Sequence, residues 1–132
     1  MKTALDHARA LLQKAANDPV AARATLATGA ATDTVCFHAQ QAVEKSLKAV
    51  LALHDVEYPW RHDIDELVEL VRPFAPEIGP YEDRIIGMTP FAVEIRYDTE
   101  FEPSLEKASE AVITAVEVQK LIAAIVGAEA DD

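Results

Sequence analysis

Polar side chains that could do chemistry recur at helical spacing within residues 40–48. Gln41, Glu44, Lys45 and Lys48 lie three or four positions apart, so they would share one stripe of an otherwise apolar helix. Glu44 and Lys48 also make a favourable i,i+4 pair of opposite charge. The stripe is typical either of a solvated helix face or of a surface that binds a ligand or a partner.

A second unusual segment, Glu94-Ile95-Arg96-Tyr97-Asp98, places a lone arginine and a tyrosine between two expected helices. The planar guanidinium of Arg96 suits two roles. It can anchor a buried carboxylate, Glu44 among them, or it can face an anionic ligand through its forked N–H donors.

The histidines and the cysteine do not form a recognisable catalytic or metal-binding pattern. Cys36 and His38 are two residues apart, so a helix would point them to different faces, and we interpret Cys36 as structural. No two of the four histidines have the i,i+3 or i,i+4 spacing of paired metal ligands. His62 precedes an expected helix cap, where a histidine often orients a turn. We therefore predict no metal site.

Composition narrows the classes of function further. The four glycines form no phosphate-binding loop, which argues against a P-loop or dinucleotide fold, and we expect no cofactor. A lone cysteine cannot form an internal disulfide, and no apolar signal-peptide core follows Met1. No apolar run approaches the roughly 20 residues of a membrane span. We expect a cytoplasmic protein without a membrane partner.

The net charge of −11 is concentrated in the second half of the chain. Residues 1–62 carry seven basic and six acidic side chains, whereas residues 63–132 carry five and seventeen. Such an acidic chain is poorly suited to non-specific binding of a phosphate backbone, which needs clustered lysine and arginine. Contact with nucleic acid would require a local basic cleft. Alternatively, the acidity only keeps the protein soluble.

The elements that would position these residues are helices. We predict four main helices. The first covers residues 3–16, and the second covers 35–55 with Asp33 or Thr34 as its cap. The third runs from the Asp63–Glu66 capping box to Pro73, and the fourth runs from Pro103-Ser104 to Gly127. Asn17-Asp18-Pro19 should break the first, leaving residues 20–31 as a loose connection or short helix. Two short helical pieces should flank a kink at Thr89-Pro90. The expected fold is all-α, one domain over 1–132 forming an up-and-down bundle.

Three segments resemble the HEPN family (higher eukaryotes and prokaryotes nucleotide-binding). Phe37 to Ala49 is similar to the signature helix of the family, and Arg61-His62-Asp63-Ile64 resembles the segment that opens its next helix. Thr89-Pro90-Phe91 through Arg96-Tyr97 resembles the segment before its final helix. The matches occur in the order of the family within about 70 residues, and the helix plan agrees with them.

The resemblance implies a bundle of about five helices that usually dimerises. Many members pair with a minimal nucleotidyltransferase, as toxin–antitoxin components or as substrate-binding companions. Others are metal-independent RNases whose arginine is followed, after four to six residues, by a histidine. Arg96 matches that arginine, but Phe101, Glu102 and Pro103 stand where the histidine is expected, and no histidine follows residue 62. Because that imidazole helps to move a proton, its absence argues against nuclease activity.

Two functions follow from the resemblance. The leading one is a homodimeric HEPN module that binds a minimal nucleotidyltransferase, with Gln41, Glu44, Lys45, Lys48, His62 and Tyr97 as ligand- or partner-binding residues. Its ligand would be RNA or a nucleotide. The alternative is a metal-independent RNase toxin in which Arg96 is catalytic within a dimer cleft. A plainer third reading is a helical scaffold in which Arg96 and Glu44 serve only internal packing.

Overall fold

The computed structural model describes residues 1–58, 63–91 and 102–130, and helices are the regular elements of these ranges. They are α1 (Ala4–Ala15), α2 (Asn17–Leu26), α3 (Thr32–Leu53), α4 (Ile64–Val71), the 3-10 helix η1 (Pro76–Tyr81), α5 (Glu82–Ile86) and α7 (Leu105–Ala130). No strand occurs within the described ranges. The all-α prediction is confirmed.

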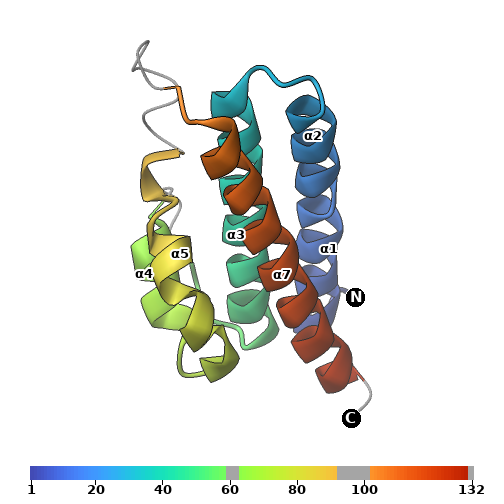
Figure 1. The fold of residues 1–132 in the computed structure, drawn as a ribbon. Helices are drawn as coiled ribbons and strands as arrows, with labels where there is room; N and C mark the ends of the chain where they lie inside the picture. The colour runs from blue at the N-terminus through green and yellow to red at the C-terminus, as the bar shows by residue number, and fades with distance from the viewer. Residues whose placement is uncertain (59–62, 92–101, 131–132) are drawn as a thin grey trace.

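The helices form an up-and-down bundle (Figure 1). Helices α1 and α2 follow one another along one side, and α3 returns beside them. The α4, η1 and α5 segments lead back on the opposite side, and α7 runs in the same direction as α3. Helix α3 packs against α1, α2, α4 and α7, so it lies at the centre.

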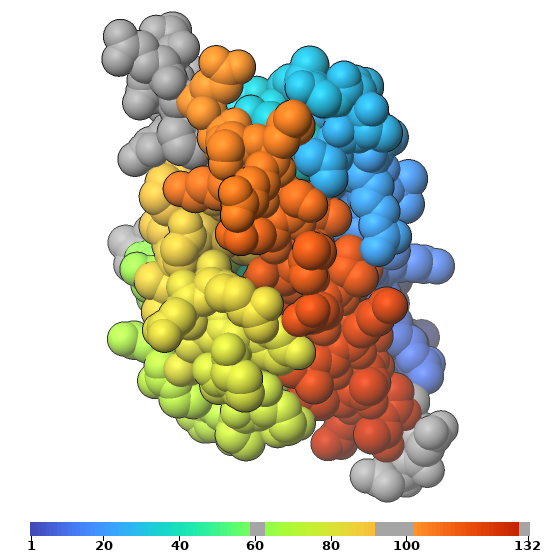
Figure 2. Space-filling view, viewed as in Figure 1, coloured from blue at the N-terminus to red at the C-terminus, as the bar shows by residue number. Residues whose placement is uncertain are grey.

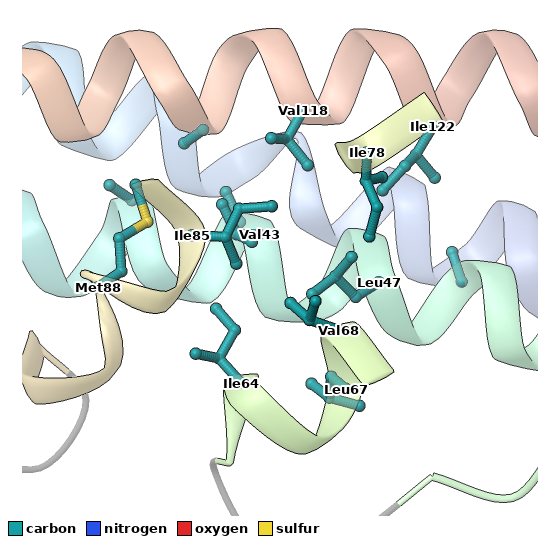
Figure 3. Packing of buried hydrophobic residues seen from close by; sticks show 14 of the residues in the cluster. Val43, Leu47, Ile64, Leu67, Val68, Ile78, Ile85, Met88, Val118 and Ile122 are labelled. Carbon is teal, nitrogen blue, oxygen red and sulfur yellow. The ribbon is translucent and has the colours of Figure 1, made fainter. Parts of the chain in front are cut away.

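The core gathers around helix α3 because its apolar side chains project to several neighbours. Val43 and Leu47 meet side chains from α4, η1, α5 and α7 in one cluster (Figure 3). The cluster includes Ile64, Leu67, Val68, Ile78, Ile85, Met88, Val118 and Ile122. On the other side, α3 faces the small residues Ala8 and Ala22, which are also fully buried. The predicted apolar stripe of α3 is thus surrounded on most sides.

Side-chain caps mark the starts of three helices. Thr3 and Asp6 form a reciprocal capping box at α1, and Asp63 accepts a hydrogen bond from the Glu66 amide at α4, as predicted. At α7 the Ser104 hydroxyl accepts a hydrogen bond from the amide of Lys107. Each of these bonds satisfies an amide that has no partner within its helix.

Three predicted boundaries are wrong. Helix α3 begins at Thr32 after Ala31, which has a left-handed backbone with φ of 52° and gives no side-chain cap, so neither Asp33 nor Thr34 is the cap. Helix α7 continues through Gly127 to Ala130, because a glycine weakens a helix by only about 1 kcal/mol. The expected kink at Thr89-Pro90 lies earlier, at the Gly87-Met88 turn, and residues 89–91 are helical.

The Asn17-Asp18-Pro19 segment ends α1 but immediately starts α2. Pro19 is the third residue of α2, where the amide that proline lacks has no helical partner in any case. The proline therefore fits into the first turn. Residues 17–26 form the short helix that was one of the two alternatives for this stretch.

Helix α7 is long and apolar enough to cross a bilayer by length and composition, although charged and polar residues interrupt its apolar sequence. The segment Leu105–Glu129 has a mean hydropathy of 1.7 over its most apolar window, and 39% of that window is buried in the bundle. Its buried residues recur every three or four positions, at Ala108, Ala111, Val112, Ala115, Val118, Ile122 and Val126. Core helices of bundles have the same stripe.

Leu47 tests the central position of α3. Its side chain is fully buried, so Leu47→Ala should lower the free energy of unfolding by about 2–5 kcal/mol through lost apolar contact and the cavity left behind. Urea denaturation followed by circular dichroism measures this. Val20→Ala, at a side chain that is 68% exposed, should change stability by less than about 0.5 kcal/mol. Equal effects of the two substitutions would contradict a core centred on α3.

Candidate functional site

The carboxylate of Glu44 lies inside the bundle although it belongs to the predicted polar stripe. Its side chain is only 2% exposed. Lys48 Nζ lies 4.0 Å from Glu44 Oε1, and Gln41 Nε2 donates to Glu44 Oε2 at 3.3 Å. The side chain of Lys48 is itself 15% exposed. The stripe is therefore not a solvated face, since a buried carboxylate requires partners of this kind.

Gln41 joins Glu44 to the neighbouring amide of Gln40. Gln41 Nε2 also donates to Gln40 Oε1 at 2.8 Å. Gln40 is fully buried, and its Nε2 has no hydrogen-bond partner among the described residues. A buried donor without a partner costs about 1–3 kcal/mol. Among the described residues, Thr32 Oγ1 at the start of α3 is likewise buried without a hydrogen-bond partner.

Lys45, the other lysine of the stripe, is paired across the helix interface. Its Nζ lies 2.8 Å from Asp18 Oδ2 in α2, and His38 Nδ1 lies 3.1 Å from Asp18 Oδ1. The Asp18 side chain is 9% exposed, whereas His38 and Lys45 are 30% exposed. One nearly buried carboxylate thus binds two side chains that are two helical turns apart on α3.

Asp18 and His38 were not among the predicted site residues. In the sequence Asp18 is part of a predicted helix break, and His38 has neither the spacing to pair with Cys36 nor that of a paired metal ligand. The sole sequence signal is the seven-residue spacing of His38 and Lys45, which puts them on one helix face. Which acidic residue would meet them depends on the packing of α2, and spacing alone does not specify that.

The lower end of the stripe meets an aromatic side chain. Lys48 Nζ lies 5.3 Å from the ring centroid of Tyr58, close enough for a cation–π attraction. The Tyr58 hydroxyl lies 3.2 Å from Nε2 of His7 at the start of α1. Polar groups therefore extend from His38 to Tyr58 along one side of α3.

The structure brings four of the predicted site residues together and leaves the rest outside the described residues. Gln41, Glu44, Lys45 and Lys48 lie on consecutive turns of α3. The other three predicted residues, His62, Arg96 and Tyr97, fall in the ranges 59–62 and 92–101, outside the described residues. The predicted contact between Arg96 and Glu44 remains a prediction.

The described groups suit binding more than bond cleavage. They supply an amide donor, two ammonium groups and a carboxylate, and each makes at least one hydrogen bond or ion pair within the protein. Because these groups are already paired, a ligand would make additional contacts with them and would not have to provide their first partner. Among the described residues no group of three or more His, Cys, Asp or Glu side chains could hold a metal ion.

Cys36 is a buried structural thiol, as the sequence indicated. It is fully buried, and its neighbour His38 bonds to Asp18 instead. Burial raises the pKa of the Cys36 thiol to about 11 from its ordinary 9.0, although Lys107 acts in the opposite direction. The thiol therefore stays protonated and unreactive at neutral pH.

Asp18→Asn tests the link between α2 and α3. The neutral amide would remove the negative charge that pairs with Lys45, so the free energy of unfolding should fall by roughly 1–3 kcal/mol. Chemical denaturation gives the value. The matched control is Asp55→Asn, because Asp55 is exposed and its left-handed backbone also suits asparagine. A loss no larger than in this control would contradict a stabilising role for Asp18.

The raised pKa of Cys36 predicts a pH-dependent contribution to stability. The unfolded thiol ionises near its ordinary pKa, so the contribution is complete below pH 9 and is lost as the pH rises through about 11. The stability difference between the native protein and Cys36→Ala should therefore shrink between pH 8 and pH 10.5. Comparing the two proteins cancels the titration of lysines and tyrosines. A difference that stays constant would contradict the raised pKa.

The comparisons with known proteins agree with the helix plan. The HEPN domain family model matches residues 8–125, which include α3 and its polar stripe. No curated protein and no solved structure matches the chain significantly. Because the family match spans most of the sequence, the chain belongs to the HEPN domain family.

Proposed function

We propose that this HEPN protein forms a homodimer and binds a minimal nucleotidyltransferase in the cytoplasm. It would act either as the toxin component of a toxin–antitoxin pair or as a substrate- or nucleotide-binding companion. The single observation that carries the proposal is the polar stripe of α3, whose charged side chains are buried or partly buried: Glu44 pairs with Lys48, and Lys45 pairs with Asp18 of α2. Such groups are costly to bury, so a chain that needed α3 only for packing would be expected to carry apolar residues there.

The order of groups along α3 supports a binding role. Lys48 contacts both Glu44 and the ring of Tyr58, so its ammonium is held in place while part of the side chain remains exposed. Gln41 is fixed by two hydrogen bonds from the same nitrogen. Side chains held in this way lose little conformational entropy when a ligand or a partner binds.

The charge of the chain supports a basic protein partner. Residues 63–132 carry twelve more acidic than basic side chains, so a nucleotidyltransferase that binds this part of the chain should have a basic surface. Opposite net charges accelerate encounter and make association sensitive to salt. The same charge opposes direct binding of RNA over most of the surface.

The competing function is a metal-independent RNase centred on Arg96, in a chain that has no histidine after residue 62. His38 Nδ1 donates to Asp18 Oδ1 of α2, and the His38 side chain is 30% exposed. An RNase would need such an imidazole, or His62, to act with Arg96. The missing histidine favours the binding module.

Affinity purification from native cells tests the partner. Under gentle, low-salt conditions a small basic nucleotidyltransferase should be recovered with the dimer, and Lys48→Gln should reduce the recovered amount severalfold if the α3 stripe contributes to the interface. Lys14→Gln, at an exposed lysine of α1, is the matched control. Recovery of the homodimer alone in every sample would count against the proposal.

An RNA cleavage assay separates the two functions. The purified dimer, incubated with RNA and a chelator, should leave the RNA intact, and Arg96→Ala should behave in the same way. Cleavage by the native protein that disappears in Arg96→Ala would make the chain an enzyme and overturn the binding-module proposal.

A further inference from the structure

A hollow lies between α5 and α7, on the side of the molecule away from the α1–α2 column (Figure 2). Its volume is about 430 Å³, within the range of small-molecule sites. Buried side chains of Met88, Phe91 and Ala111 contribute apolar lining, and Ile113 borders it with half of its surface exposed. The lining is thus mainly apolar.

Two cations and one carboxylate also line this α5–α7 hollow. They are Arg84 from α5 and Lys107 and Glu110 from α7, so the lining has a net charge of +1 in a chain of net charge −11. The hollow therefore carries a positive charge within the acidic half of the chain, residues 63–132. This charge favours an anionic ligand over a cationic one.

Both cations can interact with a ligand. Arg84 Nη1 lies 3.7 Å from Glu117 Oε2, but both side chains are about half exposed, so this pair is weak. Lys107 Nζ lies 5.8 Å from the ring centroid of Phe91, near the apolar lining. A ligand with an acidic group could therefore meet an ammonium and a guanidinium while its apolar part contacts Phe91 and Met88.

We propose that the α5–α7 hollow binds a small amphiphilic anion, with an apolar body and one acidic group held by Lys107 and Arg84. This site is separate from the α3 stripe. The proposal does not depend on whether the protein binds a nucleotidyltransferase or cleaves RNA. Burial of the apolar part of the ligand against the apolar lining provides most of the affinity, and the two cations favour an anionic ligand over a neutral one.

Two fluorescent probes that differ by one acidic group test the proposal. They are 1-anilinonaphthalene-8-sulfonate and its uncharged parent, N-phenyl-1-naphthylamine. The sulfonate should bind the folded protein with one site per chain and roughly fivefold more tightly than the parent, as expected for one partly exposed ion pair. Equal affinity, tighter binding of the parent, or no binding of either probe would overturn the proposal.

Substitutions locate the site. The double variant Arg84→Gln, Lys107→Gln should lose the preference for the sulfonate, whereas Lys120→Gln, at an exposed lysine of α7 outside the lining, should keep it.

The apolar lining is tested in the same way. Ile113→Ala should weaken the binding of both probes to the same degree, and Ile86→Ala, at an exposed isoleucine outside the lining, should weaken the binding of neither. Circular dichroism confirms that each variant is folded. A preference that survives in the double variant would place the anion elsewhere and contradict the proposal.

Discussion

The enclosure of α3 is the constraint on which the rest of the structure depends. A helix that contacts α1, α2, α4 and α7 has almost no side that faces bulk water. Its apolar residues can meet this demand by packing, but its charged residues must find partners within the protein. Glu44 and the α2 residue Asp18 each do so, and together they organise the polar network of the bundle.

The same constraint means that a binding function of α3 would share its residues with stability. The side chains that pair Glu44 and Asp18 are also the ones that remain partly exposed. In a helix with a fully solvated polar face, those residues could change with little effect on folding. Here a change that alters binding at Lys48 or Lys45 also unpairs a buried carboxylate. Selection for a ligand or a partner would therefore act on the fold as well.

Helical periodicity was sufficient to predict the all-α class and the pairing of Glu44 with Lys48, because both depend on contacts within one helix. The width of the apolar stripe on α3 predicted its central position, because a stripe on two sides requires neighbours on both. The Asp63 cap was predictable because it also depends on contacts within one helix. The pairing of Asp18 with Lys45 was not, since it spans 27 residues and depends on how α2 lies against α3. The start of α3 was misplaced because Ala31 adopts a left-handed backbone that its residue type does not announce. The continuation of α7 past Gly127 reflects packing that outweighs a weak local preference.

Asp18 contacts two residues of α3, and this also affects how far α1 and α2 are shifted along the axis of α3. The residues of α1 and α2 that are fully buried include alanines, Ala8, Ala15 and Ala22, and small side chains of equal size pack about equally well after a shift along the axis. His38 and Lys45 are separated by about 10 Å along α3, so a single carboxylate reaches both only when it lies near the midpoint between them. Moving α2 by one turn in either direction would abandon one of the two contacts. A single charged residue thus adds a preference for one alignment to the one that the leucines of α1 and α2 already provide.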